Sequence, residues 1–235
     1  QFIYDKYLRR ELINTGYDIV NGALQENLDE SAMDQISTAE RALYNLADSG
    51  DAQGGFIDFS DALVSSLSII ESAYQKQGKI SGLPTGLNKL DYKIGGLNNS
   101  ELIILAGRPS MGKTALATNI AYNVAEFLAH DTEVPPENRG VAFFSLEMSS
   151  EELAARILAT TTQTSSQKMR VGDLDEAEFT RITAAVRELE NIPLYIDDTP
   201  GVSINAIRNR ARRLKRSKGL GLIVIDYIQL MSGTG

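Results

Sequence analysis

The chain has 235 residues, of which 43% are hydrophobic, so it can bury a sizeable core in one large domain or in one domain with an appendage. It has no cysteine, which excludes disulfides and cysteine-ligated zinc, and it has no run of 18 apolar residues and no signal-like N-terminus. These features exclude a predicted membrane span and favour the cytoplasm. The net charge of −8 arises mostly from residues 1–80, where 6 Lys and Arg accompany 13 Asp and Glu, so it says little about the ligands of residues 81–235.

Residues 1–80 are predicted to be helical. Apolar periodicity favours helices over 1–27 and 32–48, and the glycine-rich stretch 50–55 has the composition of a flexible linker. A third helix is predicted over 58–77, with a narrow apolar stripe at spacings of 4, 4, 3 and 4 formed by Phe59, Leu63, Leu67, Ile70 and Tyr74. This stripe fits either a groove on a neighbouring subunit or ordinary packing within its own. We therefore expect three regions: 1–48, 49–80 and 81–235.

From residue 81 onward strand and helix patterns alternate, which predicts an α/β domain with a mostly parallel sheet covered on both faces. The predicted strands are Leu102–Ala106, Val141–Leu146, Leu194–Ile196 and Leu222–Ile225. Helices are predicted from Thr114, after the capping-box pair Ser149 and Glu152, over 175–190 and after Ser203. The stretch 130–140 is expected to be a surface loop, and its His130, the only histidine of the sequence, receives no role.

The stretch Gly107–Thr114 reads Gly-Arg-Pro-Ser-Met-Gly-Lys-Thr and matches the phosphate-binding loop of nucleoside triphosphatases. A predicted strand precedes it and a predicted helix follows, so backbone N–H groups would converge on an anion at a helix N-terminus. Lys113 would reach the β- and γ-phosphates of ATP, and the Thr114 hydroxyl would hold Mg²⁺. The nucleotide-binding residues expected around them are Ser110, Met111, Gly112, Lys113, Thr114 and Ala115.

A phosphate loop needs a second acid at the end of a neighbouring strand to hold Mg²⁺. Asp226 follows four large aliphatic residues, the pattern of a central strand buried on both faces. The competing pair, Asp197 and Asp198, follows a short segment behind Pro193, and proline is tolerated only at the start or edge of a strand. Asp226 is therefore the predicted Mg²⁺ ligand, and the other two are expected to cap a loop.

Hydrolysis also needs a group that orients the attacking water. The position directly after Asp226 is Tyr227 rather than an acid, so the carboxylate must come from another strand. Glu147 stands just beyond the strand 141–146, at the edge where ligands gather in open α/β sheets. The alternative is that Glu147 is only an acid near a helix N-terminus, stabilised by the helix dipole.

The predicted helix 203–218 carries seven basic residues: Arg208, Arg210, Arg212, Arg213, Lys215, Arg216 and Lys218. Its apolar residues still form one face. The cations fit contacts with DNA phosphates or an acidic neighbour, but a solvated face with positive charge in the last helical turn is the simpler interpretation.

Three motifs in order resemble the bacterial replicative DNA helicases of the DnaB family: Gly107–Thr114, the Phe-Ser-Leu-Glu-Met-Ser of 144–149 and the Ile-Asp-Tyr-Ile-Gln-Leu-Met of 225–231. Shorter elements upstream, including Thr85-Gly86-Leu87 and Gly95-Gly96-Leu97, are similar to the family's entry into its RecA-like motor domain. The resemblance is strong over 81–231 and looser over 1–80.

This resemblance implies a homo-hexameric ring that hydrolyses ATP with Mg²⁺ at subunit interfaces, translocates on single-stranded DNA and unwinds the replication fork, with primase and a helicase loader as partners. Lys113 and Thr114 match the phosphate and metal ligands, Glu147 the catalytic glutamate and Asp226 the metal-coordinating aspartate. Residues 1–48 resemble the end of the N-terminal collar domain, and 58–77 the linker helix that docks on the adjacent subunit.

The family's sensor strand, DNA-binding loops and arginine finger have no counterpart here, and the chain begins at Gln1 rather than methionine. We therefore expect an excised piece with an incomplete RecA-like core, which alone hydrolyses ATP slowly or not at all, since a finger from a neighbour is commonly worth ~10³–10⁵ in rate. Two other functions stay open: another RecA-like ATPase of recombination or repair, and a nucleotide-dependent assembly platform. A P-loop kinase is disfavoured because no stretch reads as an acceptor-binding lid.

Overall fold

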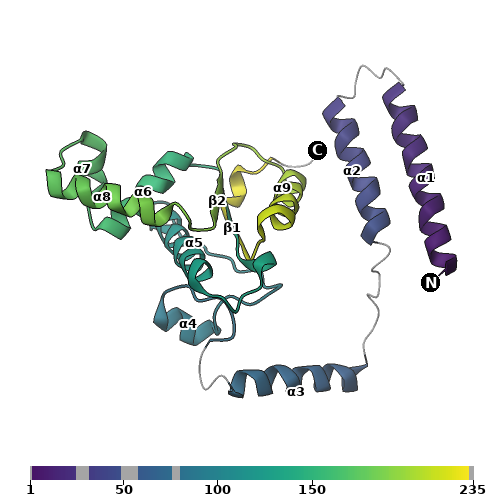
Figure 1. The fold of residues 1–235 in the computed structure, drawn as a ribbon, viewed down its shortest axis with the longest axis horizontal. Coiled ribbons are helices and arrows are strands. Elements are labelled where there is room, and N and C mark those ends of the chain that lie inside the picture. Colours follow the sequence, from purple (N-terminus) through teal and green to yellow (C-terminus); the bar gives the residue numbers. More distant parts are fainter. Residues whose placement is uncertain (1, 25–31, 49–57, 76–79, 233–235) are drawn as a thin grey trace. The chain divides into compact units, whose positions relative to one another are not determined.

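The computed structural model describes residues 2–24, 32–48, 58–75 and 80–232. The contacts between residues divide the chain into two compact units, residues 1–69 and 70–235 (Figure 1). The linker expected at 50–55 lies outside the described residues. The limits expected for the three regions, 1–48, 49–80 and 81–235, stay a prediction.

The first unit contains an antiparallel pair of helices. α1 spans Phe2–Leu24 and α2 spans Ala32–Asp48, and the two lie side by side (Figure 1). The Gln35 side chain of α2 donates a hydrogen bond of 3.3 Å to the carbonyl of Gly22 in α1. Both helices were predicted, and Gly22 costs α1 helix propensity without interrupting it.

A third helix, α3, spans Phe59–Gln75 and confirms the helix predicted over 58–77. The division between the two units falls within it, after Ile69. Its apolar stripe is exposed: Phe59 shows 75% of its surface, Leu67 56% and Tyr74 85%. An exposed stripe of this size on a single helix is typical of a surface that meets a partner.

The second unit is built on a parallel sheet of three strands, β1 (Val141–Ser145), β2 (Leu194–Asp197) and β3 (Leu222–Asp226), in the order β2-β1-β3. Every residue of the central strand β1 is buried, as expected for a strand covered on both faces. Val141 of β1 pairs in register with Leu194 and Leu222, so all three strands end at the same edge.

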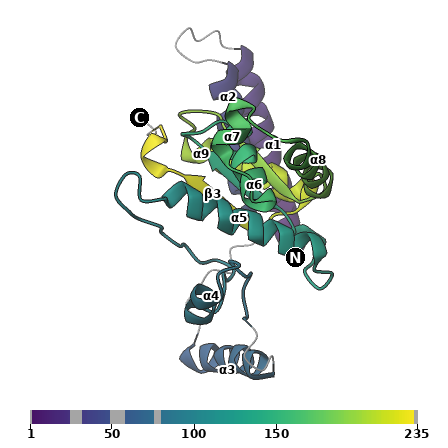
Figure 2. The ribbon, with the colours of Figure 1, turned by 90° about the vertical axis from the view of Figure 1, so that its left-hand side faces the viewer.

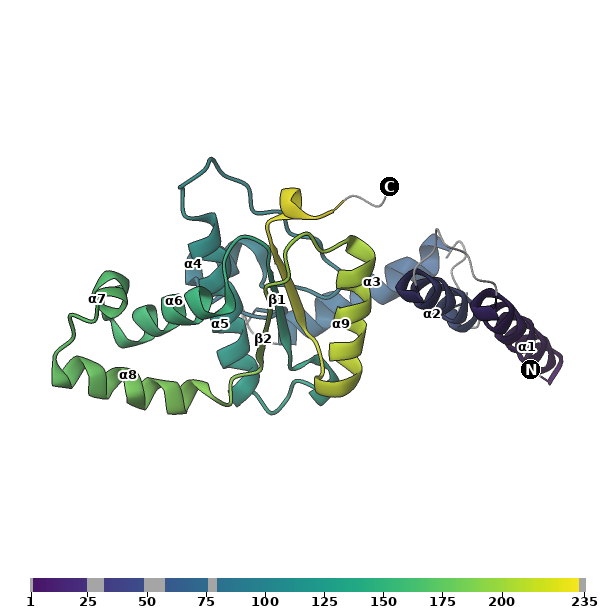
Figure 3. The same ribbon diagram turned by 90° about the horizontal axis from the view of Figure 1, so that it is seen from above.

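Helices cover the sheet on both faces (Figure 3), as the alternating pattern predicted. Val141 and Phe143 pack with residues of α5 (Lys113–His130) and α6 (Ser150–Thr162). Ala142 and Phe144 point to the opposite face and pack with Ile207 and other residues of α9 (Ile204–Lys218). Figure 3 shows α9 on one side of the strands, with α5, α6 and α8 (Glu176–Leu189) on the other. The alternation of side chains along a strand therefore builds two separate hydrophobic cores.

A short segment before the sheet is fixed to α5. It contains α4, Asn88–Ile94, which is labelled below α5 in Figure 2. The backbone N–H and the hydroxyl of Thr85 both donate to Oδ1 of the buried Asp91, at 2.8 and 2.7 Å. Asn123 of α5 donates to the Thr85 carbonyl at 2.9 Å. This polar cluster is satisfied internally and ties the start of the second unit to the helix that follows the phosphate loop.

The strand predicted over Leu102–Ala106 is wrong. The strand predicted over Leu222–Ile225 is confirmed as β3, but its predicted burial on both faces is wrong. The apolar run Leu102–Ala106 is not a strand, and Leu102 exposes 87% and Ile104 80% of its surface. β3 is only partly buried, with Ile223 43% exposed, because it lies at the edge of the described sheet instead of its centre. Apolar character alone decided neither outcome, because strand formation and burial both depend on which other segments lie alongside. In the described part of the chain no strand pairs with Leu102–Ala106.

The remaining elements are close to prediction. The helices expected over 175–190 and after Ser203 are α8 and α9, and the loop expected over 130–140 contains one 3₁₀ turn, Pro136–Asn138. α4, α7 (Ser166–Val171) and a second 3₁₀ turn, Ile228–Leu230, were not predicted, because elements this short have little periodicity. None of the described helices is long and apolar enough to cross a membrane.

Candidate nucleotide site

The phosphate loop leads directly into α5. Gly112 is the N-cap residue, with φ of 84°, and the helix begins at Lys113. This backbone angle lies in the left-handed region that glycine adopts without strain. Leu116 donates to the Gly112 carbonyl at 2.9 Å and closes the first helical turn. Ser110 and Met111 are exposed in the loop, while Lys113, Thr114 and Ala115 are partly buried.

The N-terminus of α5 differs from the N-termini of three other helices of the same unit. α6, α8 and α9 are each capped by a side chain, from Ser149, Asp175 and Ser203 respectively. No side chain caps α5. The N–H groups of its first turn therefore keep their hydrogen-bonding capacity and their share of the helix dipole for an anion.

Asp226 is the last residue of β3 and is only 5% exposed. Its Oδ2 atom is buried and has no hydrogen-bond partner among the described residues. A buried carboxylate oxygen without a partner is costly, and a bound cation removes that cost. The residue therefore fits a Mg²⁺ site, and the oxygen chemistry of Thr114 fits the same metal.

The phosphate loop and the end of β3 meet at Lys113. Its Nζ atom lies 5.4 Å from the ring centre of Tyr227, a cation–π contact. α5 also packs against β3. The contact was not predicted: the sequence showed only that Tyr227 stands where other triphosphatases carry an acid, and a side-chain contact between segments so far apart in the sequence leaves no local signal.

Glu147 lies just past the adjacent strand. Ser145 of β1 is the register partner of Asp226, and Leu146 donates its N–H to the Asp226 carbonyl at 2.8 Å. Glu147 follows in the turn before α6, and its side chain is exposed. The structure thus places Glu147 just past the end of β1 and Asp226 at the end of the neighbouring parallel strand β3, the edge where ligands gather in open α/β sheets.

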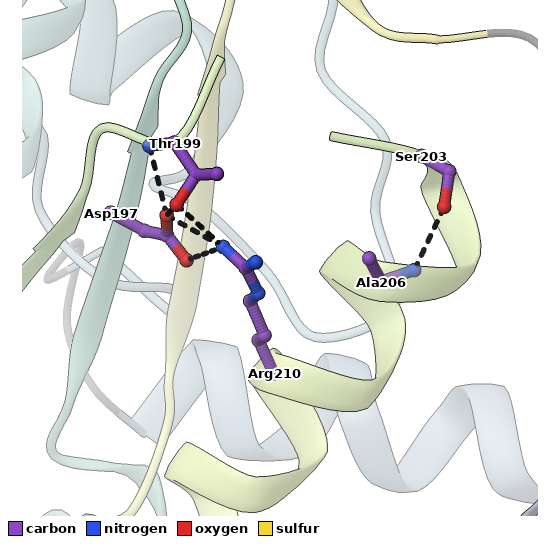
Figure 4. Close-up of polar contacts among 5 residues, drawn as sticks. All are labelled: Asp197, Thr199, Ser203, Ala206 and Arg210. Atoms are coloured by element: carbon purple, nitrogen blue, oxygen red, sulfur yellow. Dashed lines mark hydrogen bonds and ion pairs between the residues drawn. The ribbon is translucent and has the colours of Figure 1, made fainter. Parts of the chain in front are cut away.

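Asp197 and Asp198, the competing acids, have structural partners. Arg210 of α9 contacts both oxygens of Asp197, at 2.6 and 2.8 Å, and the Thr199 hydroxyl donates to the same carboxylate at 2.7 Å (Figure 4). Asp198 accepts a hydrogen bond of 2.9 Å from the N–H of Ser150 in α6. The prediction of a loop cap is confirmed for Asp197, which bonds Thr199 in the loop after β2, whereas Asp198 bonds the first residue of a distant helix.

The same contacts explain the acidity of the two carboxyls. Burial pushes the pKa of Asp197 upward, but the hydrogen bonds from Thr199 and Arg210 outweigh it and leave the pKa below its ordinary value. The pKa of Asp198 is lowered chiefly by the N–H of Ser150 and also by the Ser150 side chain. Both side chains are therefore ionised at neutral pH.

Two sequence features have ordinary structural explanations. His130 Nδ1 lies 2.8 Å from the Glu126 carbonyl, one turn earlier in α5, as a residue of a helix C-terminus commonly does. The basic helix α9 buries Ile207 and Ala211 against the sheet, and Arg210 is engaged by Asp197. Arg213, Lys215, Arg216 and Lys218 are exposed, as on a solvated face.

The chain matches known proteins over its whole length. The model of the DnaB-like helicase C terminal domain matches residues 82–235. The replicative DNA helicase DnaB of Rickettsia conorii is 43% identical over 234 residues, which cover 99% of this chain and 47% of the relative. The replicative DNA helicase DnaC of Bacillus subtilis is 37% identical over 235 residues, 100% of this chain and 49% of the relative. The chain spans about half the length of the curated relatives it matches.

Solved structures agree. A structure described as a DnaB-like replicative helicase and its interactions with primase has a TM-score of 0.74 at 28% identity, covering 100% of this chain and 51% of the other. A second structure, described as an ATPase domain, has a TM-score of 0.65 at 31% identity, covering 77% of this chain and 61% of the other. These likenesses confirm the α/β, RecA-like fold, and the chain belongs to the family of the DnaB-like helicase C terminal domain.

Proposed function

We propose that this chain is the ATP-hydrolysing part of a replicative DNA helicase. One observation carries the proposal: Lys113, at the uncapped N-terminus of α5, contacts Tyr227. Tyr227 directly follows the buried Asp226, whose Oδ2 has no partner among the described residues and whose strand ends beside the strand that leads to Glu147. An anion site and a cation site side by side fit a magnesium nucleotide.

In this proposal each residue has one task. The N–H groups of Ser110–Ala115 and the Lys113 ammonium bind the phosphates of ATP. Thr114 and Asp226 hold Mg²⁺, which when bound neutralises charge on the phosphate oxygens. Glu147 orients the attacking water and accepts its proton as the bond to the γ-phosphorus forms and ADP leaves. Glu147 suits this task because its side chain is exposed at the site.

The wider activity rests on the relatives. They are named replicative DNA helicases, which supports ATP-driven translocation on single-stranded DNA and unwinding of the duplex at a replication fork. One solved relative is described with primase, which supports primase as a partner. A helicase loader and a homo-hexameric ring follow from the resemblance, with the exposed stripe of α3 as a docking element. The proposed location is the bacterial cytoplasm, because the proposed substrate lies there.

The test uses the full-length protein, a forked DNA substrate and the variant Lys113→Ala. We expect hydrolysis of ATP that increases with single-stranded DNA, displacement of one strand of the fork, and loss of both in the variant. DNA-stimulated hydrolysis without strand displacement would contradict the helicase and support another RecA-like ATPase. Hydrolysis unaffected by DNA would instead support an assembly platform.

A further inference from the structure

The turn that carries Glu147 is held in place by hydrogen bonds to its backbone groups. The buried Ser145 donates its hydroxyl to the Met148 carbonyl at 2.7 Å, across the turn. The backbone N–H of Leu146 donates to the backbone carbonyl of Asp226 at 2.8 Å, which ties the start of the turn to β3. The Glu147 side chain has no hydrogen bond or ion pair with another described residue. The backbone on either side therefore fixes only the position of the Glu147 Cα–Cβ bond, from which the side chain extends.

The far end of the turn is fixed by a residue from another strand. Asp198 follows β2 and accepts the N–H of Ser150 at 2.9 Å, the first residue of α6. Ser149, the N-cap of α6, separately accepts the N–H of Glu152. α6 thus has its own cap, and the bond from Asp198 adds a tie between the turn and the end of β2.

Asp198 is itself on a fixed segment. The preceding residue, Asp197, forms the ion pair with Arg210 of α9, and Thr199 donates to Asp197 through its backbone N–H and its hydroxyl (Figure 4). The residues on both sides of Asp198 are therefore anchored, so Asp198 can hold Ser150 at a defined place.

We propose that Asp198 is a positioning residue for Glu147: by holding the N–H of Ser150 it fixes the turn that aims Glu147 at the water attacking ATP. The inference rests on the proposed role of Glu147 in hydrolysis. In this proposal Asp198 acts only through the geometry of the turn, by way of its bond to Ser150. A displacement of about 1 Å at a reacting group is enough to lower a rate roughly 100-fold.

If Asp198 served only to stabilise the fold, its loss would lower stability without lowering turnover more than the loss of another helix-capping acid does. The matched comparison is Asp175, which caps α8 by accepting the N–H of Glu178 at 2.7 Å but lies in the loop between α7 and α8, away from β1 and β3. Loss of either carboxylate removes the acceptor of a backbone N–H in the first turn of a helix. Only the loss at Asp198 is expected to lower turnover.

The bond can also be removed from its donor side. Ser150 is the first residue of α6, where proline is well tolerated because its missing N–H has no partner within the helix. Ser149 has φ of −70° and ψ of 160°, a conformation that suits the residue before proline. Ser150→Pro therefore deletes the bond to Asp198 while preserving the helix.

The experiment measures kcat, KM for ATP and Tm in the full-length protein with single-stranded DNA. We expect Asp198→Ala and Ser150→Pro each to lower kcat about 10-fold with little change in KM, because the phosphate loop is untouched. Asp198→Asn, which keeps an acceptor oxygen, should recover most of the loss. Asp175→Ala should lower Tm as much as Asp198→Ala does and leave kcat unchanged.

A double variant separates this inference from the proposed function. If Asp198 acts through Glu147, adding Asp198→Ala to Glu147→Gln causes no further loss in single-turnover hydrolysis of labelled ATP. A further loss of about 10-fold in that background, or unchanged kcat in both Asp198→Ala and Ser150→Pro, overturns the positioning role. Normal turnover by Glu147→Gln alone overturns the proposed function itself, whatever the Asp198 variants do.

Discussion

Asp226 and Ser145 are register partners at the ends of two neighbouring parallel strands. Ser145 hydrogen-bonds across the turn that carries Glu147, and Asp226 has a buried oxygen without a partner among the described residues. The pairing of β1 and β3 therefore brings a potential metal ligand and a potential base to one edge of the sheet, although they lie 79 positions apart in the sequence.

The first prediction concerns the buried carboxylate. Asp226→Asn should raise the free energy of unfolding by about 1 kcal/mol in the absence of nucleotide and Mg²⁺, because it removes a charge whose Oδ2 lacks a partner among the described residues. The same change should abolish the Mg²⁺ dependence of nucleotide binding. Chemical denaturation and titration with ADP, each with and without Mg²⁺, measure the two effects.

Asp91 provides the matched control. It is also 5% exposed, but its Oδ1 accepts two hydrogen bonds from Thr85. Asp91→Asn should therefore lower stability by about 1 kcal/mol, since bonds to an ionised acceptor are the stronger ones. If both variants changed the free energy of unfolding in the same direction, the result would contradict the assignment of Asp226 as a metal ligand whose buried charge destabilises the metal-free protein.

A second prediction concerns the ion pair between Arg210 and Asp197. Arg210→Ala should lower stability at pH 7 by about 0.5–1 kcal/mol, because the pair is partly exposed. The pKa of Asp197 is lower in the folded state than the ordinary aspartate pKa of about 3.9. The ion pair therefore stabilises the protein fully when the pH is above that ordinary pKa, and this stabilisation is lost as the pH falls through the lowered pKa.

Urea denaturation at about pH 7 and about pH 3 measures this difference. The gap between wild type and Arg210→Ala should shrink at the lower pH. Arg213→Ala, on the exposed side of the same helix, serves as the control and should show a small effect at both values. A gap that persists at low pH would mean that Arg210 stabilises the fold by packing and not by charge.

A third prediction concerns α3. Leu67→Glu should weaken ring assembly of the full-length protein, because it places a charge in the exposed apolar stripe. Ser65→Glu adds the same charge two residues away, on the opposite side of the helix, and should leave assembly intact. Light scattering reports the mass of the particle. An unchanged hexamer in Leu67→Glu would show that the stripe packs within its own subunit.

A fourth prediction compares two glycines with positive φ. Gly112, before α5, and Gly172, after α7, have φ of 84° and 74°, and an added Cβ would meet nothing within 4 Å at either. Substitution by alanine should cost about 1–2 kcal/mol of backbone strain at each. Only Gly112→Ala should weaken ADP binding, measured by calorimetry. Equal affinities for ADP in the two variants would show that the phosphate loop does not bind the nucleotide.

Local patterns predicted most of the helices. The side chains of Ser149 and Ser203 cap α6 and α9 as expected, because a cap and the residue that it bonds lie three positions apart. The sequence also indicated the phosphate loop, because the loop is a contiguous motif. It indicated the acids at strand ends because each acid follows an apolar run. Whether Glu147 and Asp226 perform the chemistry stays a prediction.

Contacts between distant segments were not predictable. The run Leu102–Ala106 has the composition of a buried strand, but strand formation depends on a partner elsewhere in the chain. The hydrogen bond from Ser150 to Asp198 spans 48 positions, and the contact of Lys113 with Tyr227 joins a helix to the end of a strand. Such pairs depend on topology, which the periodicity of a single segment does not encode.

The most direct test of the account is turnover by Glu147→Gln in the full-length protein, with Glu151→Gln as control. Both acids lie near the start of α6 and are exposed, so a role limited to the helix dipole predicts the same small effect for each. We predict that Glu147→Gln retains ATP affinity and loses DNA-stimulated hydrolysis, about 100-fold or more, while Glu151→Gln hydrolyses ATP normally. Normal hydrolysis by Glu147→Gln would contradict it.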